Sequence, residues 1–377
     1  MGLGDLRAPP SARSLARSLG VTRVARLTGL DRSGIEVACA VRPVGHVLQV
    51  ANGKGRSFAE ARAGALSEAA ELFGAERLDP AELLYGTLEG LRDRHGEAAV
   101  WDASDLGSAV APALWSARIF CAFRPAVDLM SGEAVLIPAQ AVHCPPEGSV
   151  PLGPIAVAWT SNGMGAHPSP ARALRHALLE AIERDQLARA LPRGWTEREI
   201  ALRRLRLDSL ARIAPGAAAL ARRFDRTGFQ LELFDLVPRG GLGLPVAGAL
   251  LFDPGGAVPL TAGYACHLRR DRALQGALLE AAQSRLTDIH GAREDLGLPD
   301  PRLARRLARA CAAAPSRSAA TLPDVPVTTA TAALAAILDR LRRRGHERAA
   351  TVELAPSGFP LSIQKVIVPG LRLSELL

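Results

Sequence analysis

One short acidic pattern occurs three times in the chain and limits its fold more than any other feature. The copies begin at Ala65, Ala177 and Ala277, in stretches of alanine and leucine with strong helix propensity. In each copy two side chains with oxygen acceptors stand three residues apart, so they project from the same face of a helix. The pairs are Glu68 and Glu71, Glu180 and Glu183, and Glu280 and Gln283.

The three copies together predict a shared site. A single pair of glutamates on a helix is ordinarily a solvated face. These copies lie roughly one hundred residues apart, too far for the period of a solenoid or propeller, and apolar residues such as Leu66, Leu178 and Leu278 flank the acids. We therefore expect the helices to pack into a core with their acids facing one cleft. Acids held together repel one another unless a cation lies between them, and Mg2+ carrying a nucleotide's phosphates suits oxygen ligands.

Composition excludes several other classes of protein. The chain has 377 residues, 48% of them hydrophobic, so it can bury a large core. It has no apolar run long enough to span a membrane and no secretory signal near its start. Its net charge of +8 comes almost wholly from arginine, and its few aromatic residues do not interleave with the basic runs, which argues against nucleic-acid binding. Scattered cysteines without CxxC spacing argue against a disulfide framework or zinc site and fit the cytoplasm.

Two smaller features near the acidic pattern, a Cys-His pair and a lysine between glycines, are further candidates for functional residues. Cys266 and His267 precede the third copy and could form a catalytic pair, whereas a packed thiol beside a helix start is the commoner use. Lys54 stands between Gly53 and Gly55 and is one of only two lysines in the chain. The sequence predicts that Lys54 lies in a glycine turn, where a compact charge can approach a ligand closely.

The spacing of turn signals and apolar runs predicts an α+β fold of repeated strand–turn–helix units. Nothing marks a linker, so we expect an N-terminal extension over residues 1–21 and one integrated domain over residues 22–377. Helices are expected at 58–77, 170–190, 271–289, 303–314 and 331–345. Strands are expected at 35–41, 46–50, 114–122, 133–142, 156–159, 229–236, 244–252, 351–354 and 363–368, with a turn at 52–55.

Several motifs, taken in order, resemble the YcaO family. Each alone would be weak, but together they are specific, and the resemblance covers roughly residues 22–372. The opening and closing motifs look most like the YcaO proteins that work with a TfuA-type partner. The motifs are residues 28–35, 53–55, 161–163, 180–185, 280–285 and 368–371.

The resemblance implies a fold and a chemistry. The fold is a YcaO-like α+β fold of mixed or antiparallel sheets with packed helices, whose acidic helices converge on a cleft for ATP and Mg2+. The activity is that of an ATP-dependent enzyme which phosphorylates a backbone amide oxygen of a ribosomally synthesised peptide. A side-chain nucleophile then gives an azoline, and an external sulfide gives a thioamide. The absence of proline from residues 371–377 favours the thioamide over the azoline-forming cyclodehydratase branch.

The same resemblance implies site residues and partners. Mg2+ would be held by Glu68, Glu71, Glu180 and Glu183. ATP would be bound by Lys54, Ser161, Asn162, Arg184, Gln283 and Arg285, with Arg184 on the phosphates. The implied partners are a precursor peptide and a TfuA-like protein that binds the leader or delivers sulfur. The resemblance names no catalytic residue and leaves open whether the chain forms a homodimer.

Three positions depart from the family's pattern. Gly64 and Gly165 stand where the family has serine, and Arg172 stands where it has a glutamate. An arginine at this position could replace one metal ion by a fixed cation. Alternatively, ATP turnover is lost and the chain is a peptide-binding scaffold. The two alternatives differ in whether the chain binds MgATP and releases ADP or AMP when peptide is present.

Overall fold

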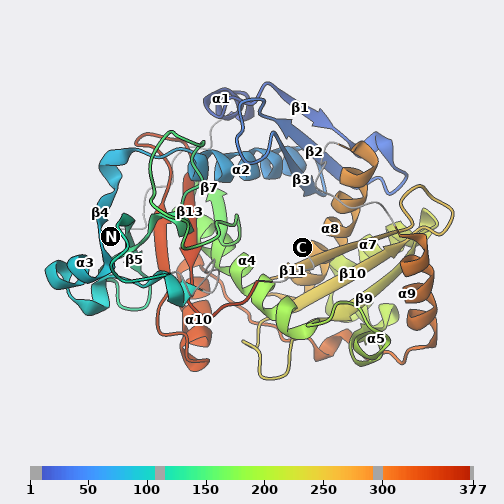
Figure 1. The fold of residues 1–377 in the computed structure, drawn as a ribbon. Helices are drawn as coiled ribbons and strands as arrows, with labels where there is room; N and C mark the ends of the chain where they lie inside the picture. The colour runs from blue at the N-terminus through green and yellow to red at the C-terminus, as the bar shows by residue number, and fades with distance from the viewer. Residues whose placement is uncertain (1–10, 107–114, 292–299, 374–377) are drawn as a thin grey trace.

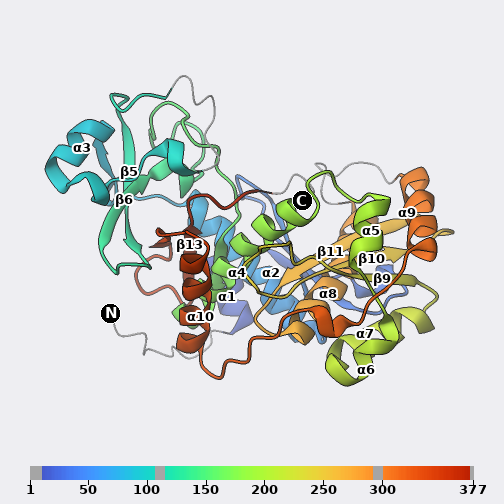
Figure 2. The same ribbon diagram turned by 90° about the horizontal axis from the view of Figure 1, so that it is seen from below.

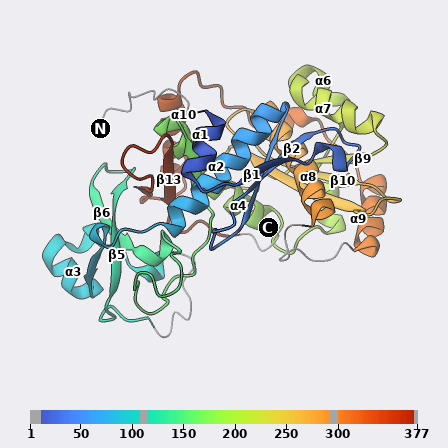
Figure 3. The ribbon, with the colours of Figure 1, turned by 90° about the horizontal axis from the view of Figure 1, so that it is seen from above.

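Three antiparallel sheets, with a long helix lying on each, form the part of the chain that the computed structural model describes, residues 11–106, 115–291 and 300–373 (Figure 1). The first sheet has the order β1-β2-β3, the second β11-β10-β9-β8, and the third β4-β5-β12-β13-β7, with β6 paired to β5. Strands β4 to β6 and helix α3 lie at one end of the molecule, and α5, α7 and α9 lie at the other (Figure 2). Seen from above, β1 and β2 lie across the middle (Figure 3). This arrangement agrees with the predicted α+β class.

The bounds of the elements follow the expected pattern for most of the chain. The helices are α1 (Ala12–Ser18), α2 (Phe58–Glu76), α3 (Leu88–His95), α4 (Pro170–Ala190), α5 (Glu197–Arg203), α6 (Leu210–Ile213), α7 (Pro215–Arg226), α8 (Arg270–His290), α9 (Pro301–Ala313) and α10 (Ala330–Arg343). The strands are β1 (Arg23–Arg26), β2 (Glu36–Val41), β3 (Val50–Gly55), β4 (Leu84–Gly86), β5 (Cys121–Asp128), β6 (Ala134–Pro138), β7 (Met164–His167), β8 (Arg204–Leu205), β9 (Gln230–Asp235), β10 (Val246–Phe252), β11 (Leu260–Cys266), β12 (Ala350–Glu353) and β13 (Ser362–Ile367).

Each acidic helix lies directly on the strand that precedes it, and a glycine makes the contact. A Cβ atom added to Gly53 on β3 would lie 2.1 Å from the backbone of α2, at Ala61 O and Ala65 N. A Cβ on Gly165 of β7 would lie 2.3 Å from Ala173 O of α4. Side chains at these positions would hold the layers apart, so the glycines let backbone meet backbone.

The third unit, β11 and α8, uses the same device. A Cβ on Gly263 would lie 2.2 Å from both Ala277 O and Ala281 N. Measured from the first acid of each helix, the contact of Gly263 lies one helical turn closer to the C-terminus than the contacts of Gly53 and Gly165. The repeat in the sequence is therefore a repeat in structure: strand, close glycine contact, then a helix with two acceptors on one face.

The helices owe their stability to packing of a small-residue face and to local caps. In α2 the buried residues include Ala61, Ala65 and Leu66, so the face on the strand is narrow and apolar. Ser57 caps α2 by accepting a hydrogen bond from Glu60 N, which satisfies a free donor of the first turn. Burial of a side chain the size of Leu66 contributes about 1.5 to 3 kcal/mol.

Three of the expected strands and one expected turn are wrong. The structure describes residues 115–122 of the strand expected at 114–122, and of these only Cys121 and Ala122 belong to a strand, the start of β5. Residues 46–49 form no strand, and residues 50–55, which include the expected turn, form β3. Lys54 accordingly lies on a strand, opposite Val37 of β2. Residues 156–159 form no strand, and β7 begins after the turn that was expected to end that strand, at Met164. The prediction failed because glycine is rare inside strands and usually indicates a turn. Here the glycine lies within a strand and lets a helix pack closely against it.

The predicted domain boundary is not tested by the fold. Residues 1–10 of the expected extension lie outside the described residues, and α1 packs its Leu15 into the same apolar core as residues of α2. The division into an extension over 1–21 and a domain over 22–377 stays a prediction. Within the described residues, the helices lack the length and apolar character needed to cross a membrane.

The glycine contacts give a direct test of one departure. We expect Gly165→Ser, which restores the family's residue, to lower the free energy of unfolding by about 3 kcal/mol or more, because its Cβ would overlap the backbone at Ala173. Gly255→Ser is the matched control, since a Cβ there meets nothing within 4 Å. Urea denaturation of both variants measures the difference, and equal losses would contradict the packing role.

Candidate functional site

Carboxylates from all three acidic helices meet, as the repeated pattern predicts. Burial raises the pKa of Glu71 on α2 well above its ordinary value, and the charges of Glu180 on α4 and Glu68 on α2 raise it further. Burial also raises the pKa of Glu183 to about 7, and the charge of Glu280 on α8 adds to this. Negative charge from α2, α4 and α8 is therefore concentrated in one place, between helices that Figure 1 shows around the middle of the molecule.

The second acid of a helix is held by the strand of the next unit. Glu71 Oε1 accepts a hydrogen bond from Ala166 N of β7 at 2.9 Å. Glu183 Oε2 accepts one from Cys266 N of β11 at 2.8 Å. Both donors immediately precede a histidine, His167 at the end of β7 and His267 directly after β11, so the two contacts are similar. Each fixes one oxygen of the carboxylate on the backbone and so sets the direction of the other.

The first acid of each helix has a different kind of partner. Glu68 Oε2 accepts from Asn52 N of β3 at 2.8 Å. Glu280 Oε2 pairs with Lys54 Nζ at 2.8 Å. Arg184 lies 3.8 Å from Glu180 and 4.0 Å from Glu183, measured from nitrogen to oxygen, which is long for an ion pair. The cationic groups therefore compensate only part of the negative charge.

A buried lysine that sequence reasoning did not select holds the turn before β7. Lys365 Nζ on β13 donates to Thr160 O and Asn162 O, both at 2.6 Å. Burial lowers the pKa of Lys365 to about 8, and the charge of Glu180 opposes that shift, so the ammonium group lies near the acids. The available signal was its rarity, because Lys54 and Lys365 are the only lysines of the chain.

This lysine places two predicted nucleotide residues, Ser161 and Asn162, beside the acids. Asn162 Oδ1 is buried and has no hydrogen-bond partner among the described residues. An unsatisfied buried acceptor costs about 1 to 3 kcal/mol, so it marks a position where a ligand's donor would be favourable. The unpaired oxygen of Asn162 and its position near the acids agree with the predicted nucleotide site. That Asn162 binds a nucleotide stays a prediction.

The predicted residues of α8 divide into two groups. Gln283 lies one turn beyond Glu280, and its carbonyl accepts from Thr287 Oγ1, which in turn accepts from Asn52 Nδ2 of β3. These contacts tie this part of α8 to the strand that carries Lys54. Gln283 therefore remains a candidate for the shared site.

Arg285 has a structural environment instead. Its guanidinium donates to Asp31 Oδ1 at 3.0 Å, to Asp253 Oδ2 at 2.7 Å and to Val258 O at 2.5 Å, and it stacks over the Phe229 ring. The side chain is 4% exposed. These contacts join the segment that contains Asp31 to the turn after β10, so we assign Arg285 to the fold and leave it out of the proposed nucleotide site.

A basic rim lies at the N-terminal turns of α4 and α8, and we define it as His167, Arg172, Arg175, His176, His267 and Arg272. Burial lowers the pKa of His167, and the charges of Arg172 and Arg175 lower it further. Burial likewise lowers the pKa of His267 to about 4, with Arg175 the next cause. No carboxylate of the described residues lies within ion-pair distance of Arg172, Arg175 or Arg272.

The basic rim adjoins the acids. The pKa of His176 is lowered by burial, raised by the charge of Glu180 and lowered by that of Lys54, so His176 lies between the two groups. The departure at Arg172 is thus one member of a local set of positive charges. Such a set can bind the oxygens of a phosphate or carboxylate through the guanidinium groups.

The pair Cys266 and His267 does not have the features of a nucleophile and its base. Burial raises the pKa of the Cys266 thiol well above its ordinary value, and the charge of Glu183 raises it further. The Nδ1 atom of His267 accepts a hydrogen bond from Arg269 N at 3.0 Å. A thiol that stays protonated is unreactive, so the packed-thiol interpretation fits.

The acids fit a Mg2+ ion that is bound together with the phosphates of a nucleotide. Within the part of the chain that the structure describes, no three Asp, Glu, His or Cys side chains come together as a metal cage. Mg2+ is usually held by one or two carboxylates, its other positions being filled by phosphates and water. The donors here are all carboxylate oxygens, the ligand type that Mg2+ prefers. Burial first and neighbouring carboxylates second raise the pKa values of Glu71 and Glu183, so a cation beside them would favour their ionised forms.

The chain belongs to the YcaO family. The family model described as YcaO cyclodehydratase, ATP- and Mg2+-binding, matches residues 52–372. A Rhizobium leguminosarum bv. trifolii protein described as an uncharacterized protein in the tfuA 3' region is 32% identical in an alignment of 374 positions, which covers 94% of this chain and 84% of the relative. A Methanothermobacter thermautotrophicus protein is 32% identical over 74% of this chain and 68% of its own length.

Solved structures share the fold. A heterocyclase in complex with substrate and cofactor matches 97% of this chain with a TM-score of 0.75 and 17% identity, and the chain spans 52% of that protein's length. The YcaO protein of Methanopyrus kandleri, bound with AMPPCP and Mg2+, matches 95% of this chain and 88% of its own with a TM-score of 0.68 and 22% identity. At these identities the likeness establishes the fold.

The raised pKa of Glu183 predicts a pH-dependent stability. Because the folded pKa of about 7 exceeds the ordinary 4.5, the ionised form destabilises the fold. The cost is absent below pH 4.5, grows as the pH rises to about 7, and is constant above. We expect Glu183→Gln, which keeps an acceptor for Cys266 N, to stabilise the ligand-free protein at pH 8 by up to about 3 kcal/mol, and to leave it unchanged at pH 4.5.

Melting temperatures from pH 4.5 to 8 measure this difference. Glu347→Gln is the matched control, because Glu347 is exposed and belongs to no acidic cluster. A melting curve for Glu183→Gln that runs parallel to that of the unchanged protein at every pH would contradict the strained-acid interpretation.

Proposed function

We propose that the chain binds ATP with Mg2+ between α2, α4 and α8 and uses it to activate a backbone amide of a peptide. The observation that carries the proposal is the convergence of carboxylates whose pKa values are raised, next to a basic rim. Phosphoryl transfer depends on positioning and on neutralising the charge of phosphates. A site with both signs of charge on rigid helices suits that task.

Each residue has a role that its surroundings support. Glu68, Glu71, Glu180 and Glu183 would hold Mg2+, which supplies charge neutralisation and alignment of phosphate oxygens when bound. The long contacts of Arg184 leave its guanidinium able to turn toward a phosphate.

Other residues would bind and orient the nucleotide. Lys54 would exchange part of its contact with Glu280 for a phosphate oxygen. The unpaired Asn162 Oδ1 would accept from a hydroxyl or amine of the nucleotide. Ser161, which directly precedes Asn162, and Gln283, one turn beyond Glu280 on α8, complete the proposed set.

Two of the three departures from the family's pattern have a packing explanation. Gly165 makes a backbone contact that a Cβ would block, and a Cβ on Gly64 would come within 3.3 Å of Gly53 Cα. The two glycines therefore allow close packing of strand and helix in this chain. They give no reason to infer that ATP turnover is lost. This favours the enzyme over the scaffold, although binding of peptide without turnover remains the competing function.

The product and the partners are the finer part of the proposal. A thioamide is proposed first, because a relative comes from a tfuA region; an azoline is the alternative, since a structural neighbour is a heterocyclase. The proposed partners are a ribosomally made precursor peptide and a TfuA-like protein. All five cysteines are free, which fits action in a reducing cytoplasm.

The first test is nucleotide binding. We expect Glu183→Gln to weaken binding of a nonhydrolysable ATP analogue with Mg2+ by at least about tenfold, since loss of even a supporting group around a metal costs this much. Isothermal titration calorimetry measures the affinity, and circular dichroism shows whether the fold is kept. Glu347→Gln should bind as the unchanged chain does. Full affinity in a folded Glu183→Gln variant would contradict the site.

The second test concerns Arg172. If its guanidinium replaces one metal-borne charge, Arg172→Glu should raise the Mg2+ concentration needed for half-maximal ADP release, because a new carboxylate calls for a cation. Arg172→Gln is the control, as it removes the charge without adding a ligand. The assay follows ADP release against Mg2+ concentration with peptide present. A scaffold would release no ADP in any of the three proteins, and that outcome would remove the enzyme.

A further inference from the structure

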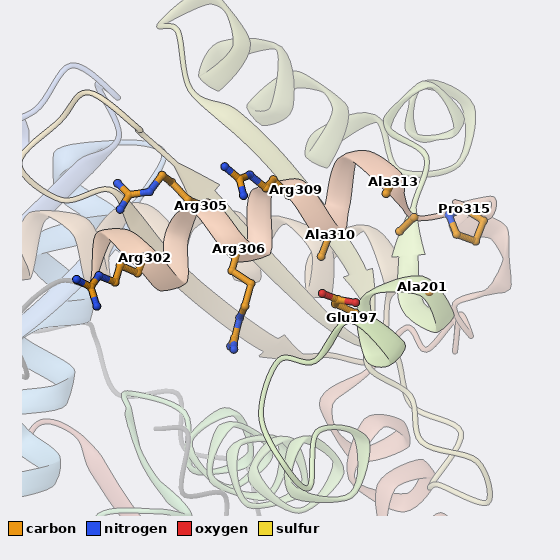
Figure 4. Close-up of a pocket in the computed structure, with 10 residues that line it drawn as sticks. Glu197, Ala201, Arg302, Arg305, Arg306, Arg309, Ala310, Ala313 and Pro315 are labelled. Atoms are coloured by element: carbon orange, nitrogen blue, oxygen red, sulfur yellow. The ribbon is translucent and has the colours of Figure 1, made fainter.

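A groove lies between α5 and α9, apart from the acidic helices. It encloses about 540 Å3 and is lined by Glu197, Ala201, Arg302, Arg305, Arg306, Arg309, Ala310, Ala313, Ala314 and Pro315. Figure 1 shows α9 at the outer edge of the molecule, and Figure 4 shows the arginines along α9 with Glu197 and Ala201 on the neighbouring α5. The groove is therefore separate from the proposed nucleotide site.

The arginines form a regular stripe on α9. Arg302, Arg305, Arg306 and Arg309 follow the spacing of neighbours on one side of a helix, three and four residues apart. The opposite side, which includes Leu307, is buried and fixes the orientation of the helix. From the first arginine to the last the stripe extends about 10 Å, at 1.5 Å per residue.

Among the described residues the stripe forms no ion pair, in contrast to arginines on α10 and α5. Arg343 on α10 pairs with Asp339 at 2.9 Å, and Arg203 on α5 pairs with Glu199 at 2.7 Å, each within its own helix. Residues 301–313 contain no acid, and the four arginines of α9 are exposed without an ion pair to any described residue. Two acids lie near the stripe without pairing with it: Asp300 precedes the helix and carries charge close to Arg302 and Arg305, and Glu197 lines the groove. Like charges one turn apart destabilise a helix, so an anionic partner would relieve the repulsion.

The apolar part of the groove, which we call its floor, restricts the kind of anion. Its alanine and proline residues lie at the C-terminal end of α9 and on α5, beside the arginines (Figure 4), and their small apolar surfaces suit short side chains of a peptide. Guanidinium forks bind carboxylates in a bidentate manner. None of the lining residues is aromatic, so the platform for stacking nucleic-acid bases is missing.

We infer that this groove binds an acidic peptide segment, whose carboxylates pair with the α9 stripe while its small side chains lie on the alanine floor. The docking itself does not depend on the proposed function. It rests on that function only where the segment is taken to belong to the modified peptide. The groove would then hold the peptide at a distance from the amide that reacts.

The test uses a fluorescein-labelled peptide of alternating Glu and Ala, twelve residues long, with fluorescence anisotropy at low and at physiological salt. We expect the double variant Arg302→Gln, Arg306→Gln to bind it at least about tenfold more weakly than the unchanged chain does. The matched control is Arg13→Gln, Arg17→Gln on α1, which removes the same charge at the same spacing from exposed positions. The control should keep its affinity within about twofold.

Three outcomes would overturn the inference. Equal weakening in both double variants would show that net charge alone attracts the probe. Unchanged affinity in the α9 variant would exclude the groove. Displacement of the acidic peptide from the groove by a lower concentration of single-stranded oligonucleotide would identify nucleic acid as the ligand. If the first α9 variant does not fold, Arg305→Gln with Arg309→Gln provides the same measurement.

Nucleotide titrations separate this inference from the proposed function. The α9 variants should bind the ATP analogue as the unchanged chain does, since the stripe lies outside the acidic site. Loss of peptide binding with nucleotide binding intact supports the groove. Peptide binding by a chain that does not bind nucleotide would contradict the proposed function alone.

Discussion

Direct contact between helix backbone and strand backbone is the constraint on which the rest of the structure depends. At Gly53, Gly165 and Gly263 no side chain separates the two layers, and any Cβ would overlap the helix. The distance between each strand and its helix is therefore set by the main chain and not by adjustable side chains. This rigidity fixes where Glu68, Glu180 and their neighbours point, because they lie on the same helices one or two turns beyond the contact.

The contacts bring together charges that oppose folding. Glu71 and Glu183 are held in place by backbone N–H groups of the next strand, which orient them without neutralising them. The raised pKa of Glu183 reflects the cost of burying its charge first and repulsion from Glu280 second. A cation bound between the helices would remove that repulsion, so the same energy that weakens the empty fold strengthens binding. Positive charge on the neighbouring rim at Arg172 and Arg175 gives an anion a place beside such a cation.

Charge of the two signs is distributed differently over the molecule. In the proposed nucleotide site acidic and basic side chains from distant parts of the chain lie next to one another, as Glu280 and Lys54 do. Along α9 the charge has one sign only, beside a small apolar floor. The first arrangement suits a compact ligand that carries its own metal, and the second suits an extended acidic chain. A protein that modifies a peptide needs both kinds of surface, and placing them apart lets each bind without competition.

The sequence by itself determined the acidic helices and their bounds to within about one residue, because helix periodicity and alanine-rich packing are local properties. It also determined the α+β class and the meeting of the acids. The tertiary structure alone decided that residues 50–55 and 164–167 are strands. Their glycines Gly53 and Gly165 are needed because a helix backbone packs directly against each strand. The tertiary structure likewise turned Arg285 toward Asp31 and Asp253 and buried Lys365 beneath Asn162. The partners of these residues are remote in sequence, so their roles depend on contacts that no local pattern records.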